Sequence, residues 1–438
     1  MSAPQGPPQP CSRTKAGRGP DALAGPGAGN QKLGSRKASP CARSRLGTST
    51  GHCAAILRAA ADPANGDRLF GLSEPPDSAA PLSKPPHAPP SQATDSPQPA
   101  DDILQALHRL GLLLPGQAVP MQALTGGVSS DIWRVDLPDG AVCVKRALAR
   151  LKVAQVWEAP VERNRHEVAY LRAAAAIVPN AVPRLMADDP VASLFVMEYL
   201  DAARHPVWKQ QLREGRADPA FAARVGEVVG TVHAATAGRA DVAATFATDA
   251  IFQAIRLEPY LGATARVHPD LAPRLLELAQ TTAATRRVLA HGDVSPKNIL
   301  VGPKGPVLLD AECAWYGDPA FDLAFCLNHL LLKCAWVPPA TAGFLACFDA
   351  LAGAYLARVD WESAQALEAR AAALLPGLFL ARVDGKSPVE YLNDEASKHR
   401  VRRVARHLLR QPVARLAQVA GAWAEACAAA HTTRGVER

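Results

Sequence analysis

The sequence VLAHGDVSPKNILVGPKGPVLLDAE occupies residues 288–312 of this 438-residue chain. It contains two short apolar runs, 299–301 and 307–309, joined by glycine, proline and lysine, and this pattern predicts a β-hairpin. Polar residues of a kind that a hairpin core does not need flank both runs. We therefore expect this segment to carry a functional site as well as to shape the fold.

Three of the flanking side chains offer oxygen ligands. Asp293 and Asn298 precede the first strand, and Asp310 ends the second. Two carboxylates and an amide oxygen at the ends of one hairpin can converge on one point, and such hard ligands suit Mg²⁺ bridging the phosphates of a nucleotide. The pattern thus indicates a phosphoryl-transfer site, with simple turn formation beside Pro296 as the alternative interpretation of Asp293 and Asn298.

Periodicity predicts the elements on either side of this segment. The expected elements are helices over 101–114 and 162–176, strands over the second half of 125–137, over 141–146 and over 193–200, and mostly Ala- and Leu-rich helices after residue 201. The first two of these strands are separated by Pro-Asp-Gly, which is a turn signal, and a Gly-Gly pair precedes the first strand. A glycine-bearing hairpin is therefore expected ahead of the helical part.

The polar pattern resembles that of a known family. His-Gly-Asp-x-x-x-x-Asn at 291–298, with Asp310 downstream, is similar to the catalytic signature of the aminoglycoside phosphotransferase and choline kinase group, within the protein-kinase-like fold. The resemblance covers about residues 121–330. It implies an α+β fold of two lobes: a small antiparallel-sheet N-lobe over 101–200 that binds nucleotide, and a mostly helical C-lobe over 201–438 with the catalytic loop and acceptor site.

The resemblance implies a role for each matching residue. Asp293 would be the catalytic base that accepts the proton of the acceptor hydroxyl. Asn298 and Asp310 would hold Mg²⁺. Lys145 would neutralise the α- and β-phosphates of the nucleotide, with Glu167 as its partner.

Further nucleotide contacts follow from the same resemblance. Gly126 and Gly127 with Ser129 would turn over the phosphates and offer backbone N–H donors. The carbonyl of Glu198 and the N–H of Leu200 would bind the adenine edge at an interlobe hinge. The implied cofactors are Mg²⁺ and ATP, or GTP, as phosphate donor.

Other residues receive supporting or acceptor roles. His291 would support the catalytic loop, and Asp322 would brace it from a buried position. The candidate substrate-binding residues are Glu312, which could also assist a second metal ion, and Arg382, Asp384 and Lys386. A loop capped by Asp384 and Ser387 is an equally good interpretation of the last group.

The acceptor is expected to be a small molecule. Asp322 follows Asp310 by only twelve residues, which leaves little room for a segment that would lay a peptide across the site. Residues 323–438 contain 14 Lys/Arg against 10 Asp/Glu, with no acidic cluster, so the charge balance disfavours polycationic aminoglycosides. Sugar, amino alcohol and aminoglycoside acceptors all remain open.

Two alternatives to an active small-molecule kinase are kept. A regulatory pseudokinase would retain the nucleotide pocket without turnover, although intact Lys145, Asp293, Asn298 and Asp310 argue against it. An atypical protein kinase would phosphorylate protein, although the chain lacks the Ala-Pro-Glu motif of protein kinases.

Composition separates the first hundred residues from the rest. Residues 1–100 hold 17 of the 38 prolines and 11 Lys/Arg against 6 Asp/Glu, and they are expected to form a disordered tail. Nine cysteines without a Cys-x-x-Cys pair argue against a disulfide framework, and no targeting signal is recognised. We expect a cytoplasmic protein whose partners are a nucleotide and a small-molecule acceptor, with no nucleic acid, membrane or protein partner.

Overall fold

The computed structural model describes residues 99–124, 130–148 and 161–436, with side chains described between residues 100 and 429. The chain divides into two units, residues 1–90 and 91–438, and every element described below belongs to the second unit. The predicted tail and the glycine segment with Gly126, Gly127 and Ser129 lie outside the described residues.

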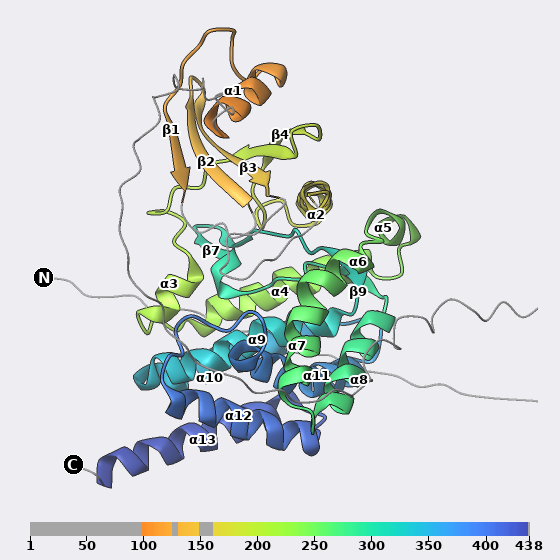
Figure 1. Cartoon of the computed structure of the whole chain (residues 1–438), viewed down its shortest axis with the longest axis vertical. Helices are drawn as coiled ribbons and strands as arrows, with labels where there is room; N and C mark the ends of the chain where they lie inside the picture. Colours follow the sequence, from red (N-terminus) through yellow and green to blue (C-terminus); the bar gives the residue numbers. More distant parts are fainter. Residues whose placement is uncertain (1–98, 125–129, 149–160, 437–438) are drawn as a thin grey trace, which may run out of the picture. The chain divides into compact units, whose positions relative to one another are not determined.

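A five-stranded antiparallel sheet forms the first part of this unit (Figure 1). Its strands, in spatial order, are β1 (Met121–Leu124), β2 (Ser130–Leu137), β3 (Gly140–Ala147), β5 (Leu194–Glu198) and β4 (Leu185–Asp189). The hairpin of β2 and β3 and the strand β5 match the sequence-based expectation, whereas β4 was not expected. Gly140 has φ +127°, which explains the glycine in the turn between β2 and β3.

The two faces of the sheet are covered by different helices. Helix α1 (Pro99–Arg109) buries Ile103 and Leu107 in one cluster with Val144 and Val196. Helix α2 (Arg163–Ile177) lies toward the opposite face, where its buried residues join a cluster with Phe195 of β5. Side chains alternate along β3, so Lys145, which pairs with Phe195 in the register, points to the α2 face.

Residues 288–317, which include the predicted hairpin, form two small antiparallel pairs. Strand β6 (Val288–Ala290) pairs with β9 (Trp315–Gly317), and β7 (Ile299–Gly302) pairs with β8 (Gly305–Leu308). The short 3₁₀ helix η2 (Pro296–Asn298) leads into β7. The predicted hairpin is therefore present, and the polar residues stand at its ends.

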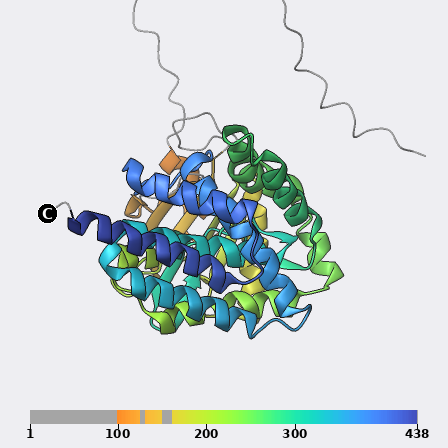
Figure 2. The ribbon, with the colours of Figure 1, turned by 90° about the horizontal axis from the view of Figure 1, so that it is seen from below.

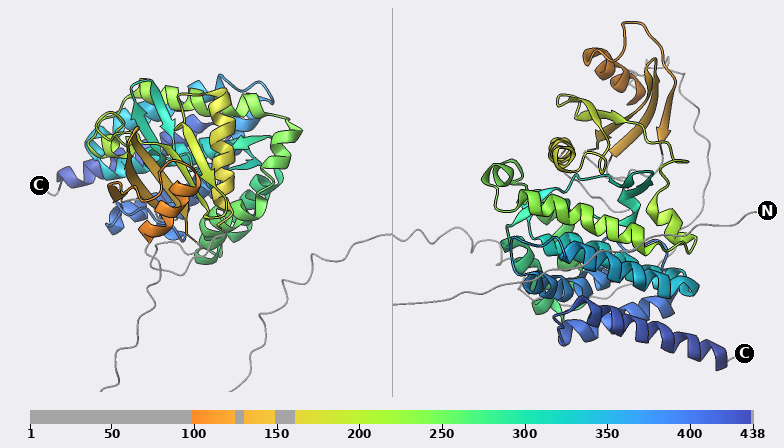
Figure 3. Two further views of the ribbon diagram at one scale, coloured as in Figure 1. Left: turned by 90° about the horizontal axis from the view of Figure 1, so that it is seen from above. Right: turned by 180° about the vertical axis from the view of Figure 1, so that it is seen from behind.

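Helices make up the rest of the unit. They are α3 (Trp208–Arg213), α4 (Pro219–Thr236), α5 (Ala240–Thr245), α6 (Asp249–Phe252), the π-helix η1 (Gln253–Gly262), α7 (Ala263–Val267), α8 (Ala272–Ala284), α9 (Pro319–Trp336), the 3₁₀ turn η3 (Pro338–Ala340), α10 (Thr341–Leu356), α11 (Ala364–Asp384), α12 (Glu395–Arg410) and α13 (Leu416–Val436). Figure 3 shows the sheet on one side of this helical part, and Figure 2 shows α12 and α13 covering its far end. The predicted α+β architecture of two lobes is confirmed.

Helix α9 is the centre of the helical part. Every residue from Pro319 to Ala335 is buried, and α10, α11 and α13 all pack against it. Most of its residues are apolar, as expected of a helix covered on all sides, and the polar exceptions include Asp322 and Lys333. The stretch 338–356 is long and apolar enough to cross a membrane by composition alone, but in the structure α10 packs its buried side chains, Phe348 and Tyr355 among them, against α4 and α9. The six cysteines among the described residues are unpaired and buried.

Candidate active site

Lys145 joins the sheet, helix α2 and the second hairpin through two ion pairs. Its ammonium lies 2.8 Å from Oε1 of Glu167 and 2.5 Å from Oδ1 of Asp310. Burial alone would lower the pKa of Lys145, but the carboxylates of Asp310 and Glu167 raise it above its ordinary value, so the ammonium stays charged. The structure thus brings three of the predicted residues to one point.

Asp310 is held in an unusual backbone conformation beside this cation. Its φ is +66°, in the left-handed region that few residues other than glycine and asparagine adopt readily. The preceding residue, Leu309, donates its N–H to the carbonyl oxygen of Asn298 at 2.8 Å. Burial would raise the pKa of the Asp310 carboxyl, but Lys145, Lys297 and Arg256 hold it well below its usual range. The carboxylate is therefore ionised at neutral pH.

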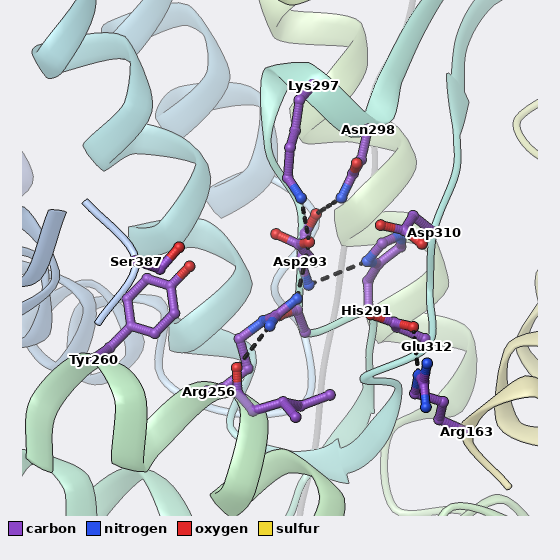
Figure 4. Close-up of polar contacts among 12 residues, drawn as sticks. Arg163, Arg256, Tyr260, His291, Asp293, Lys297, Asn298, Asp310, Glu312 and Ser387 are labelled. Carbon is purple, nitrogen blue, oxygen red and sulfur yellow. Dashed lines mark hydrogen bonds and ion pairs between the residues drawn. The ribbon is translucent and has the colours of Figure 1, made fainter. Parts of the chain in front are cut away.

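Asp293 lies at the centre of the loop between β6 and η2 (Figure 4). Its backbone carbonyl accepts a hydrogen bond of 3.1 Å from Nδ2 of Asn298. Its Oδ2 receives two cations, Arg256 at 2.8 Å and Lys297 at 3.2 Å. Because both contacts are to Oδ2, Oδ1 is the oxygen left to approach a substrate.

Asn298 and Asp310 offer oxygen atoms of the kind that bind Mg²⁺. The Asn298 amide uses its Nδ2 to bond the Asp293 carbonyl, which leaves its oxygen as a ligand, and Asp310 is an ionised carboxylate. In proteins Mg²⁺ is held by one or two such oxygen groups together with phosphates of the substrate. The two side chains therefore fit the predicted metal, and no larger cluster of His, Cys, Asp or Glu suited to a metal ion occurs among the described residues.

The backbone of the catalytic loop is fixed by Asp322, which is completely buried in α9. Its two carboxylate oxygens accept the N–H groups of His291 at 2.7 Å and Gly292 at 2.8 Å. Gly292 has φ +77°, and a Cβ there would lie 2.6 Å from the carbonyl oxygen of Cys313. Only glycine therefore fits at the turn that presents Asp293.

Two histidines complete this support. The Nδ1 of His291 accepts the N–H of Asp293 at 3.2 Å, which places the proton of the neutral ring on Nε2. Burial lowers the pKa of His291, in keeping with a neutral ring. Behind Asp322, the Nε2 of His233 lies 3.2 Å from the carboxylate, and its Nδ1 lies 2.8 Å from the hydroxyl of Tyr355. Helices α4, α9 and α10 are thereby tied to the loop.

Arg256 is a site residue that sequence reasoning missed. It is buried in the π-helix η1, where Nε donates to the carbonyl of Gly292 at 2.6 Å and Nη1 to that of Ile255 at 2.7 Å. Its third contact is the ion pair with Asp293. The one signal in the sequence was a lone arginine in an apolar stretch, far from the recognised motif.

Replacing Arg256 by glutamine should lower kcat by about 10- to 100-fold with little change in the KM for nucleotide, because the side chain orients Asp293 through its contacts with the catalytic loop. Steady-state kinetics would show this split. Arg256→Lys, which keeps one charged donor, should recover part of the loss. An equal fall in both variants, accompanied by a lower midpoint of urea unfolding, would indicate a role in folding instead.

The remaining predicted residues of the nucleotide and metal sites are Glu198, Leu200 and Glu312. Glu198 ends β5 and uses its side chain to accept the N–H of Arg184 at 2.8 Å, and Leu200 follows in the connection to α3. Glu312 pairs with Arg163, at 2.9 Å from Nε, so its carboxylate is engaged on the α2 side of the site.

The three candidate substrate-binding residues from the C-terminal loop lie in different surroundings. The carboxylate of Asp384 binds Arg402 and His268, each at 2.8 Å, and does not line the pocket that lies beside Lys297. Lys386 is exposed and also does not line it. Arg382 does line a pocket beside Lys297. The structure thus brings only one of these three residues close to the catalytic loop.

The sheet, the cation between two carboxylates and the braced loop together define a phosphotransferase of the kinase type. A sequence model of the phosphotransferase enzyme family matches residues 120–367, more than half of the chain, and the chain belongs to this family. This confirms the resemblance inferred from residues 291–310 and the predicted class of enzyme.

Individual relatives are more distant. A methylthioribose kinase from Pectobacterium atrosepticum is 25% identical over 283 residues, which cover 58% of this chain and 69% of the relative. One from Yersinia pseudotuberculosis is 27% identical over 242 residues, covering 48% and 57%. The chain therefore spans less than two thirds of the Yersinia relative.

Solved structures with a similar fold include two kinases. A choline/ethanolamine kinase family protein from Mesorhizobium loti has 16% sequence identity and a TM-score of 0.43, with 74% of this chain and 99% of that chain covered. An ethanolamine kinase from Plasmodium vivax has 12% identity and a TM-score of 0.46, with 71% and 89% covered.

Proposed function

We propose that this protein is a Mg-ATP-dependent kinase that phosphorylates a hydroxyl group of a small molecule. The observation that carries the proposal is the convergence of Lys145, Glu167 and Asp310 beside the loop that presents Asp293. These are the parts that a phosphoryl transfer needs: a cation for the phosphates, oxygen ligands for a metal ion and a carboxylate for the nucleophile.

The chemistry assigned to the chain's own residues follows from their contacts. Oδ1 of Asp293 accepts the proton of the acceptor hydroxyl while Arg256 and Lys297 hold Oδ2, so the oxygen that attacks the γ-phosphorus is oriented before reaction. Lys145 offsets the charge of the phosphates. Mg²⁺, held by Asn298 and Asp310, would supply further neutralisation of the charge on the leaving diphosphate.

The family and the relatives' names support a small acceptor. The curated relatives are methylthioribose kinases, and we propose a sugar-like, polyhydroxylated acceptor for this chain on that basis. A regulatory pseudokinase is not favoured, because Lys145, Asp293, Asn298 and Asp310 are all present, with Lys145 in contact with Asp310 and Asn298 in contact with the backbone of Asp293. An atypical protein kinase is not favoured either, because the family match and the relatives point to small molecules.

The test is a measurement of nucleoside diphosphate release by the purified full chain. ATP and GTP would each be offered with Mg²⁺ across a panel of sugars, sugar acids, amino alcohols, hydroxy-amino acids and aminoglycosides. We expect release that depends on a sugar-like acceptor and is lost when Mg²⁺ is removed by a chelator. Tight Mg-nucleotide binding with no release for any acceptor would favour the regulatory alternative.

A further inference from the structure

A pocket next to the catalytic loop is lined almost entirely by basic and aromatic side chains. We call it the basic pocket, and its lining residues are Lys209, Pro296, Lys297, His329, Lys333, Arg382, Glu390 and Tyr391. It contains three lysines, one arginine and a single carboxylate. Such an excess of one charge in a concave site indicates a ligand of the opposite charge.

The basic pocket reaches the catalytic aspartate through Lys297. The ammonium of this lysine is 3.2 Å from Oδ2 of Asp293, and the same side chain lines the pocket. Arg382 contacts the hydroxyls of Tyr260 at 3.1 Å and Ser387 at 2.9 Å. In the view of Figure 4, these two hydroxyls lie on the side of Asp293 opposite Asp310. A ligand bound in the pocket would therefore lie next to Asp293, where an acceptor hydroxyl is needed.

Lys333 is the most distinctive residue of the pocket. It is 1% exposed, and its ammonium lies 3.7 Å from the ring centre of Tyr391 and 4.3 Å from that of Trp336. Among the described residues, no carboxylate forms an ion pair with it. Glu390, the one acid that lines the pocket, binds Lys209 instead. Lys333 is therefore a buried amine surrounded by rings and by other cations, without a counter-ion.

Arg382 and Tyr391 also carry polar atoms without partners. Arg382 is 8% exposed, and its Nε has no hydrogen-bond partner within the described part of the chain. The hydroxyl of Tyr391 is likewise buried without a partner there. Buried polar groups are nearly always satisfied in folded proteins, and exceptions call for an explanation such as a ligand.

Burial and the neighbouring positive charges of the pocket disfavour the protonated form of Lys333. Burial, and then the charges of Lys209 on α3 and Arg382 on α11, lower its pKa to about 6, while Glu390 opposes them. Burial and the same group of cations lower the pKa of His329, one turn away on α9, well below its ordinary value. An anion in the pocket would favour the protonated form of Lys333 and reverse this effect.

We infer that the acceptor of this kinase carries a carboxylate or phosphate group, which binds Lys333 and Arg382 in the basic pocket while its hydroxyl faces Asp293. The inference rests on the proposed kinase function and names the acceptor's chemical class: a polyhydroxylated acid or a sugar phosphate. A cationic amino alcohol or aminoglycoside would be repelled by the same groups.

The test compares matched acceptors on the full chain. Glucose, gluconate and glucose 6-phosphate form one set, and ribose, ribonate and ribose 5-phosphate form another. Binding would be measured by calorimetry with Mg²⁺ and a non-hydrolysable ATP analogue, and turnover by ADP release. We expect at least one anionic member to bind tenfold or more tightly than its neutral counterpart, and the carboxylate and phosphate arms distinguish the two sources of charge.

Substitutions connect such a preference to the pocket. Lys333→Met preserves the length of the side chain between the two rings and removes the amine, and it should weaken binding of the anionic member at least tenfold without changing the Kd of the nucleotide. Lys304→Met removes an exposed lysine in the turn between β7 and β8 that does not line the pocket, and it should leave both unchanged. Arg382→Gln provides a second variant if Lys333→Met does not fold.

Proton uptake gives an independent signature. At pH 7.5, binding of the anionic member should draw a proton onto the wild-type protein and much less onto Lys333→Met, measured as the dependence of binding heat on buffer ionisation. The other titratable or charged groups that line the pocket, Lys209, Lys297, His329, Arg382, Glu390 and Tyr391, are common to both proteins.

The outcomes separate the two proposals. Equal binding of neutral and anionic members, or an anion preference that survives both Lys333→Met and Arg382→Gln, would overturn the inference while leaving the kinase function intact. Pocket-dependent binding of an acid with no ADP release for any acceptor would support the anion site and contradict the kinase function.

Discussion

Asp293→Asn should lower kcat by about 10²- to 10⁴-fold and leave the Kd of Mg-nucleotide within about twofold, the range expected when a general base is removed. The carboxylate accepts the proton only as the hydroxyl attacks, so its loss is felt in the transition state. Asparagine has nearly the same shape and can still accept the hydrogen bond from Arg256, and the backbone carbonyl that receives Asn298 is unchanged.

The measurement is single-turnover formation of the phosphorylated product together with nucleotide titration. The matched control is Asp241→Asn, which should retain full turnover. Asp241 lies at an exposed position in α5, and its carboxylate pairs with Arg239 at the N-cap of that helix. Wild-type turnover in Asp293→Asn would show that another group takes the proton.

Asp322→Ala should destabilise the protein by about 3–5 kcal/mol, the cost of breaking a buried, charged hydrogen-bond network by removing one partner. The substitution leaves the N–H groups of His291 and Gly292, and the ring of His233, without their acceptor. Each of these donors would remain buried, so little of the loss can be recovered by water.

Urea unfolding at neutral pH measures this loss, with Asp322→Asn as the closer variant. The amide keeps one acceptor oxygen, so its cost should lie between those of the wild type and the alanine variant. A change below about 1 kcal/mol for alanine, the size expected of an ordinary surface position, would contradict the bracing role.

The same residue predicts part of the acid sensitivity. Burial would raise the pKa of Asp322, but the hydrogen bonds from His233 and His291 hold it below its usual value. A carboxyl with a lowered pKa in the folded state contributes stability above its unfolded pKa, and this contribution is lost as the pH falls through the folded value. The stability of Asp322→Asn should therefore depend less on pH below about 4 than that of the wild type.

The hairpin segment could be interpreted from sequence because its chemistry is local. Asp293, Asn298 and Asp310 stand at the ends of short strands within one stretch of chain, and the family resemblance that they carry implied the role of Lys145 on an earlier strand. The two-lobed architecture was implied by the family resemblance. The catalytic roles themselves stay predictions until the variants are measured.

Contacts between distant parts of the chain could not be predicted. Arg256 reaches Asp293 from a π-helix, a geometry for which hydrophobic periodicity gives no signal. Asp384 was a cleft candidate by composition, yet α12 supplies Arg402 as its partner. The count of charges after residue 323 showed only an excess of Lys and Arg over Asp and Glu, and the fold is what gathers Lys209, Lys333 and Arg382 around one cavity.

The helices that cover the sheet and the far end of the helical part have a practical consequence for recombinant work. The family match begins at residue 120 and ends at residue 367. A fragment cut at those limits would lose α1 and leave Val144 and Val196 facing water. It would also lose nearly all of α11 with Arg382, and the helices α12 and α13 that follow. An expression boundary should therefore be drawn from the packing of the helices, before Pro99 and after α13, since the shorter fragment would aggregate.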